Sequence, residues 1–175
     1  GDRQEVTFTE TTFQPPDVYM VDEPQNMVWR ADYFTLLDLD GDGVRELILS
    51  ITNGSVDMYE LFNCWNGQLF DNRRWERAFC DLRTDGSFTG SGGAGSHYLC
   101  RAGFREGVME EEFSHYEADP WPDADGGTLD GRHISEAEWN AIWAAQQGKP
   151  LVQWYAFTEE NLDDMFTAEP MPLFM

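Results

Sequence analysis

Lysine is almost absent from this chain, in which Lys149 is the only one. With the arginines it makes 11 basic residues against 33 acidic ones, a net charge of −22 at pH 7. Such a surface repels the phosphate backbone of nucleic acids, so nucleic-acid binding is excluded, and it disfavours anionic membrane surfaces for the same reason. Cations are therefore the natural small partners of the chain.

Long apolar runs are absent as well. No stretch of about 18 apolar residues occurs, so no membrane-spanning helix is predicted. The chain opens on polar residues 1–4 rather than on an apolar signal sequence, which fits a mature, processed protein.

Cysteine is scarce. Cys64, Cys80 and Cys100 are an odd number, so at most one internal disulfide can form, and the lack of a Cys-x-x-Cys pair argues against a structural zinc site. We expect three free thiols packed within strands, because free cysteine behaves as a small apolar residue. A single disulfide is the alternative.

Aromatic side chains, by contrast, are abundant at 14% of the 175 residues, and hydrophobic residues reach 41%. A chain of this length and composition can bury a substantial core, and its aromatic content favours β-rich packing. We therefore expect one domain over residues 1–175.

Residues 33–116 read as a β-meander. Apolar runs are separated by short turns such as Asn66-Gly67 and Glu106-Gly107, and two-residue turns can join only antiparallel strands. The predicted strands are 33–37, 46–51, 58–65, 68–70, 75–82, 87–89, 97–104 and 108–116. The glycine-rich stretch 90–96 lacks the ending of a phosphate-binding loop, and we expect a bulged hairpin connection there, with a ligand-contacting backbone nest as the alternative.

The flanking regions are less regular. Residues 1–32 are punctuated by prolines and predict only a strand at 6–8 and a short helix at 25–32, while 117–133 predicts an acidic loop. Residues 134–175 predict two helices, one capped by Ser135 with Glu138 and one capped by Thr158. The expected fold class is α+β: a twisted antiparallel meander with C-terminal helices packed on one side.

The clearest chemistry lies between the first two strands of the meander. The nonapeptide 38–46, Asp-Leu-Asp-Gly-Asp-Gly-Val-Arg-Glu, places carboxylates at loop positions 1, 3, 5 and 9 and glycine at position 6. Calcium takes six to eight hard oxygen ligands, and alternate residues of a tightly curled loop point the same way. Carboxylates this close repel one another without a cation, so the pattern predicts a calcium site; magnesium is less suited to a flexible cage of many oxygens.

The loop departs from an EF-hand, because Leu49 stands where the bidentate glutamate would be and a β-type sequence follows. It resembles the strand-flanked calcium loops of FG-GAP and integrin-α blades. The resemblance implies side-chain ligation by three aspartates and a glutamate, and carbonyl ligation at position 7: Asp38, Asp40, Asp42, Glu46 and Val44. Since Glu46 also begins an apolar strand, a bound ion is expected to act as a folding ligand.

A wider resemblance covers about residues 33–167. The loop ahead of hairpins, the segment Gly90-Ser-Gly-Gly-Ala-Gly-Ser-His-Tyr98 and the closing Ile134-Ser-Glu-Ala-Glu-Trp139 together look like uncharacterised secreted lipoproteins of Gram-positive gut anaerobes. The resemblance implies an extracellular or envelope-anchored location and lends no activity.

Other constellations are weaker. Asp123, Asp125 and Asp130 crowd the acidic loop, where a solvated turn is favoured and a weak second cation site is the alternative. Ser96 and His97 are adjacent on a strand and point to opposite faces, so they cannot pair as nucleophile and base. Lys149 follows a helix end, where we expect it to meet the helix dipole rather than a serine.

No catalytic set emerges from the sequence. We therefore expect a non-enzymatic, calcium-binding extracellular domain that acts in adhesion or ligand binding at the cell envelope, with a wall or host polymer as its partner. An envelope hydrolase using dispersed acidic residues is the alternative. A cleft ringed by acids would favour the enzyme, and a flat aromatic patch would favour binding.

Overall fold

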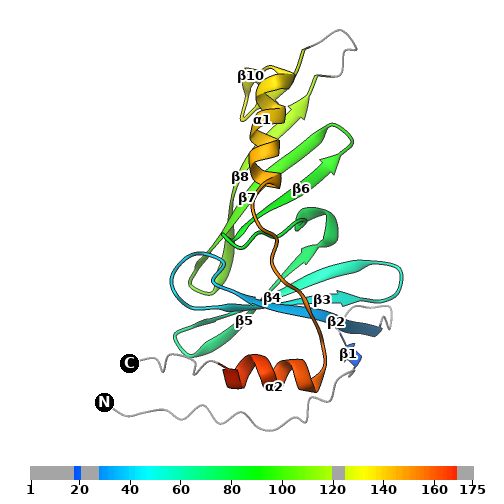
Figure 1. Ribbon diagram of the computed structural model, residues 1–175, viewed down its shortest axis with the longest axis vertical. Coiled ribbons are helices and arrows are strands. Elements are labelled where there is room, and N and C mark those ends of the chain that lie inside the picture. Colours follow the sequence, from blue (N-terminus) through cyan, green and yellow to red (C-terminus); the bar gives the residue numbers. More distant parts are fainter. Residues whose placement is uncertain (1–17, 21–27, 120–124, 169–175) are drawn as a thin grey trace.

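The computed structural model describes residues 18–20, 28–119 and 125–168, which form two antiparallel sheets and two helices (Figure 1). Sheet A has the strand order β1-β2-β3-β4-β5, and β11 also pairs with β2. Its strands are β1 (Val18–Met20), β2 (Val28–Leu37), β3 (Glu46–Thr52), β4 (Asp57–Trp65), β5 (Gln68–Trp75) and β11 (Tyr155–Ala156). The predicted strand at 6–8 lies outside the described residues.

Sheet B follows along the chain after a short 3-10 helix, η1 (Glu76–Ala78), and has the order β10-β9-β8-β7-β6. Its strands are β6 (Ser87–Gly93), β7 (Ser96–Arg105), β8 (Val108–Ala118), β9 (Gly127–Leu129) and β10 (Arg132–Ile134). The α+β prediction with an antiparallel meander is confirmed, with the refinement that the meander divides into two sheets.

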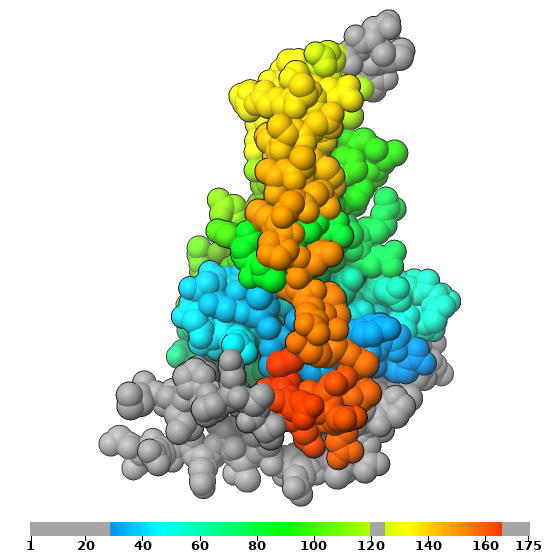
Figure 2. All heavy atoms as spheres, viewed as in Figure 1, coloured from blue at the N-terminus to red at the C-terminus, as the bar shows by residue number. Residues whose placement is uncertain are grey.

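Each helix covers a different sheet. Helix α1 (Glu136–Gln147) lies along sheet B, and α2 (Glu159–Ala168) lies beneath sheet A (Figure 1). Both predicted caps are present, since the Ser135 hydroxyl accepts from Glu138 N at 3.2 Å and the Thr158 hydroxyl accepts from Asn161 N at 3.3 Å. The connection between the helices runs down the molecule from one sheet to the other (Figure 2).

The central core lies between the sheets. It joins apolar side chains of both sheets to the segment between them and to the connection after α1: Leu39, Ile48, Leu61, Phe79, Leu82, Phe88, Cys100, Ala102, Met109 and Val152. On β3, Ile48 faces this core while its neighbours Leu49 and Ile51 face a second cluster, which Leu162 of α2 partly covers. Sheet A is thus buried on both faces, which explains the nearly continuous apolar run of β3.

A third cluster joins sheet B to α1. Trp139 stacks on Tyr116 with ring centroids 4.0 Å apart and an angle of 5°, and Ile134 is buried beside them. His97 also lies against Trp139 and Trp143. Trp139 is therefore buried in this cluster, and Trp143 packs against it.

Polar contacts fix the two sheets to each other along β5 and β8. The Asn72 side chain donates to Gly107 O at 3.1 Å and accepts from Met109 N at 2.8 Å, and Arg74 pairs with Glu111 at 2.7 Å. An amide that bonds both the carbonyl just before β8 and an N–H at the start of β8 specifies register as well as proximity.

Several local predictions are wrong. Residues 28–32 of the predicted helix belong to β2, and 25–27 lie outside the described residues. The strand predicted at 75–82 is divided among the end of β5, η1 and a single bridge between Cys80 and Thr89, because the chain leaves sheet A here and enters sheet B. The acidic loop 117–133 contains the β9–β10 hairpin, whose turn was not recognised.

The three cysteines are free, as expected. Cys100 is buried in β7, but Cys80 is half-buried outside the named strands and Cys64 is exposed on β4. The expected burial therefore holds fully for Cys100 alone, since Cys64 lies one residue before the end of β4, where residues 64–69 around the β4–β5 turn are all exposed.

No helix within the described part of the chain is both long and apolar enough to cross a membrane.

Sheet A also contains an ion pair whose carboxyl group, that of Glu60, is buried. Glu60 on β4 is fully buried and accepts from Arg73 on β5 at 2.6 Å. Burial raises the pKa of Glu60 above its ordinary value, the nearby carboxyl of Asp71 raises it further, and Arg73 opposes both effects. The folded protein therefore holds a proton on Glu60 more tightly than the unfolded chain does.

This pair predicts how stability depends on pH. Because the folded-state pKa of Glu60 is raised, its contribution is present at low pH and is lost as the pH rises through the folded value. In EDTA, the free energy of unfolding should fall from pH 5 to pH 8 by up to about 1 kcal/mol per pH unit. In urea titrations, the free energy of unfolding of Glu60→Gln should fall less steeply with pH than that of the wild type. The control Glu117→Gln, which changes an exposed residue, should show the same pH dependence as the wild type. An unaltered slope in Glu60→Gln would contradict the assignment.

Candidate metal centre

The predicted calcium loop connects β2 to β3. The pairing of these strands ends at Leu37 and Glu46, so the loop is the tip of a hairpin anchored in the middle of sheet A. Gly41 and Gly43 have φ of +83° and +89°, and a Cβ on either would meet no atom within 4 Å. Glycine is needed at both positions for backbone conformation and not for space.

Three of the four predicted carboxylates come together. Asp38, Asp40 and Asp42 each offer an oxygen, and these oxygens all lie within 4.8 Å of one another. Two oxygens that bind one calcium ion at about 2.4 Å can be at most about 4.8 Å apart. The three aspartates therefore have a spacing that one ion can bridge.

The same carboxylates shape the loop through its backbone. Asp38 accepts from Gly41 N at 2.8 Å and from Gly43 N at 3.0 Å. Asp40 accepts from Asp42 N at 3.1 Å, and Asp42 accepts from Val44 N at 2.7 Å. These bonds gather the acids on one side of the loop, so little rearrangement is required to bring them around an ion.

Glu46 lies differently from the resemblance-based expectation. Its side chain is buried, it accepts from Leu39 N at 2.9 Å, and it is not a member of the three-aspartate group. The pKa of Glu46 is raised to about 7, mainly by burial and further by the charges of the three aspartates, while the hydrogen bond from Leu39 N opposes this rise. A cation in the loop would offset these effects and favour the ionised form.

Leu39 has a structural role in the loop that the spacing of the metal ligands does not reveal. Its side chain is almost fully buried in the central core, while the flanking Asp38 and Asp40 belong to the acid group. Its carbonyl lies against Gly86, where a Cβ would come within 2.2 Å of it. The sequence does contain a signal for this role, because an apolar residue between two metal-binding acids must point away from the ion.

The weaker second cation site finds no support in the described residues. Asp123 lies outside them. Asp125 accepts from Glu136 N at 3.4 Å, and Asp130 accepts from His115 N at 2.8 Å. These two acids are thus engaged with different backbone groups.

A serine and a histidine do meet, although not the adjacent pair. The Ser96 hydroxyl lies 2.9 Å from His115 Nε2 on the neighbouring strand. Sequence reasoning missed this pair because it compared only near neighbours along the chain.

Lys149 also differs from expectation. Its ammonium contacts Asp85 and the Ser87 hydroxyl, each at 3.0 Å. Partial burial works to raise the pKa of Asp85, but the hydrogen bonds from Ser87 and Lys149 prevail and lower it to about 2. Arg83, not Lys149, bonds the carbonyls at the end of α1. Ser87 is buried and also bonded to Gln146, so this network is structural.

The face of sheet B opposite α1 is covered by the central core at Cys100 and Ala102, and it reaches the surface at Phe113. His97 and Leu99 contact the helix side, so the alternate residues Ser96 and Tyr98 point the other way. Tyr98 stacks on His115 with centroids 4.8 Å apart and meets Phe113 edge-on at 5.7 Å. Phe113 is 55% exposed, whereas Tyr98 and His115 are half-buried and Tyr98 also packs against the central core. Phe113 is therefore the accessible ring of this aromatic patch, defined here as Tyr98, Phe113 and His115.

Comparisons of the chain with known protein families, with curated proteins and with solved structures found no match.

The contact between Leu39 and Gly86 predicts that replacing Gly86 by a larger residue is unusually destabilising. Gly86→Ala must place a Cβ against backbone at a φ of +77°, whereas Gly67→Ala has a similar φ of +75° and open space. We expect Gly67→Ala to cost about 1 kcal/mol of stability and Gly86→Ala at least about 3 kcal/mol. Urea unfolding of the two variants measures the difference, and equal costs would show that the loop does not press on this turn.

Proposed function

We propose that this protein is a calcium-binding, non-enzymatic extracellular domain that binds a polymer at the cell envelope. The observation that carries the calcium assignment is the group formed by Asp38, Asp40 and Asp42, whose oxygens lie within bridging distance of one ion. The loop glycines, the strand-flanked nonapeptide and the net charge of −22 support it independently.

Calcium fits better than magnesium. The loop offers oxygens on a flexible, glycine-containing hairpin tip, whereas magnesium demands a near-ideal octahedron at shorter distances. Without the bidentate glutamate of an EF-hand, the affinity should fall in the range of extracellular calcium modules, with a Kd of about 0.1–1 mM.

The ion would act on the fold rather than on a substrate. Its ligands alternate with Leu39, which is packed in the central core, and the loop ends at Glu46, the first residue of β3. Ordering the loop therefore stabilises the attachment of sheet A to the core.

The extracellular location is supported by the resemblance to secreted lipoproteins, and binding is supported by the aromatic patch on sheet B. The exposed ring of Phe113 suits the apolar faces of sugar rings. The net charge disfavours a polyanion. We therefore assign a neutral polysaccharide as the polymer.

The rival activity is hydrolysis, which the Ser96–His115 contact favours. A nucleophile and base also require a group that orients the base. Within the described residues, His115 meets Asp130 through its backbone N–H and not through its ring. Ser96 and His115 are also only half-buried, so water is not excluded from the pair.

Calcium should raise the thermal stability. With a Kd of about 0.1–1 mM, 10 mM calcium should raise the melting temperature by roughly 3–10 °C relative to EDTA, and magnesium should do less. Asp38→Ala should remove most of this shift, while Asp164→Ala, an exposed acid on α2, should leave it intact. Scanning calorimetry without a calcium shift in the wild type would overturn the metal assignment.

Polysaccharide binding and hydrolysis make opposite predictions for variants of Phe113 and Ser96 on sheet B. Phe113→Ala should abolish retardation of the protein in native gels that contain a neutral polysaccharide, because it removes an exposed ring, whereas Ser96→Ala should retain it. A fluorophosphonate probe should not label the wild type. Labelling that disappears in Ser96→Ala would instead establish a serine hydrolase.

A further inference from the structure

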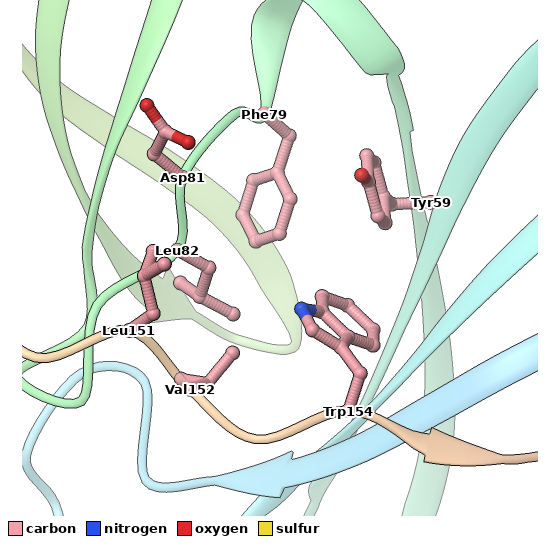
Figure 3. A pocket seen from close by; sticks show the side chains of 7 residues that line it. All are labelled: Tyr59, Phe79, Asp81, Leu82, Leu151, Val152 and Trp154. Atoms are coloured by element: carbon pink, nitrogen blue, oxygen red, sulfur yellow. The ribbon is translucent and has the colours of Figure 1, made fainter.

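A second candidate binding site lies in a cavity of about 190 Å³ between the two sheets, where the connection after α1 crosses the gap (Figure 3). Three aromatic rings, three aliphatic side chains and one carboxylate line it: Tyr59, Phe79, Trp154, Leu82, Leu151, Val152 and Asp81. They come from β4, from the segment between η1 and β6, and from the connection itself.

The rings form inclined walls. Tyr59 lies 5.2 Å from Phe79 at an angle of 53° and 5.7 Å from Trp154 at an angle of 39°, measured between ring centroids and planes. Figure 3 shows the Trp154 indole turned toward Leu82 and Val152 across the cavity. The site is accessible, because Tyr59 and Trp154 are only half-buried and Leu151 at the rim is 57% exposed.

The surroundings of the cavity are negatively charged. The side chain of Asp81 is 48% exposed; one of its oxygens accepts from Gln147 at 3.3 Å and lies 3.9 Å from Arg83. Burial raises the pKa of Tyr59, and the negative charges of Asp57, Glu76 and Asp81 raise it further. The acids around this ring thus create a field that attracts cations.

The position of Asp81 is conformationally costly. Its φ is +51°, a left-handed conformation that non-glycine residues seldom adopt, although aspartate and asparagine tolerate it best. The backbone thereby places a carboxylate beside the rings.

We infer that this cavity binds a small organic ammonium cation, such as a quaternary ammonium group. Aromatic faces with a nearby carboxylate attract such a cation through ring quadrupoles and charge, and alkyl groups on the nitrogen fill the apolar space between Leu82, Leu151 and Val152. The volume equals about six water molecules at ~30 Å³ each, which fits a ligand the size of choline.

Other ligand classes fit less well. An anion would meet Asp81 and a chain of net charge −22. A bare metal ion requires several oxygen ligands, whereas this lining offers one carboxylate, one phenol and ring faces. A neutral apolar ligand would gain from the rings but not from the charge.

This site goes beyond the calcium-dependent function proposed above and shares no ligand residue with the loop. Binding of the ammonium ion should therefore persist in EDTA at a temperature at which the metal-free protein is folded. Failure of either proposal leaves the other testable.

The test compares choline with 3,3-dimethylbutan-1-ol, in which carbon replaces the charged nitrogen. Titrations of the full chain would follow the indole N–H signals of the tryptophans by NMR, with the Trp154 signal assigned from its loss in Trp154→Leu. We expect choline to shift the Trp154 signal and to bind roughly tenfold tighter than the neutral isostere. Equal affinities, or a Trp154 signal that does not move, would overturn the proposal.

Two further variants separate the site from the fold. Asp81→Asn keeps the left-handed backbone and removes the charge, so it should weaken choline binding about threefold to tenfold and leave binding of the neutral isostere unchanged. Trp75→Leu, which removes an exposed tryptophan outside the cavity, should bind choline as the wild type does. Unchanged choline affinity in Asp81→Asn would rule out the role assigned to the carboxylate.

Discussion

The packing of Leu39 is the constraint on which the rest of the molecule depends. Its side chain fills the core between the sheets, its N–H is held by the buried carboxylate of Glu46, and its carbonyl lies against Gly86 at the turn into sheet B. One residue therefore fixes the acid-bearing loop, the start of β3 and the approach of the second sheet. The alternation of side chains then requires Asp38 and Asp40 to point outward, so formation of the core itself concentrates negative charge on the other side of the loop.

That charge is not confined to the surface. Glu46 and Glu60 are both buried on sheet A, and burial raises the pKa of each, so the fold carries a cost that grows as carboxylates ionise. The cost of burying the two carboxylates is offset by different partners. Glu60 has a permanent partner in Arg73, whereas Glu46 receives one backbone N–H and faces three aspartates. A chain with 11 basic residues against 33 acidic ones has few side-chain cations to spare, which supports the proposal that an external cation binds the loop.

How far the sequence predicts this structure depends on the range of the contacts involved. Hairpins closed by Asn66-Gly67 and Glu106-Gly107, and helices capped by Ser135 and Thr158, follow from a few adjacent residues and were predicted. The break after Trp75 was not, because only packing between sheets decides that the chain leaves sheet A there. The proximity of Ser96 to His115 was within reach: a turn at 106–107 pairs Arg105 with Val108 and so, seven steps along, Tyr98 with His115. Ser96 is then one diagonal step away on the same face. The inward turn of Glu46 could not be foreseen, since ligand spacing says nothing about burial.

The connection after α1 explains why a cavity exists between the sheets at all. It is held at its upper end by Arg83 on the carbonyls of Gln147 and Lys149, in the middle by Val152 N donating to Leu82 O, and at its lower end by the pairing of β11 with β2. Because this connection is held at three points, it spans the gap between the sheets without filling it. The rings of Tyr59, Phe79 and Trp154 line the space that remains. Leu82 borders this cavity and Gly86, four residues later, touches Leu39 of the acidic loop. The short segment between them is therefore the place where the acidic loop and the cavity both meet the central core, and its geometry is set by the same packing that holds the sheets together.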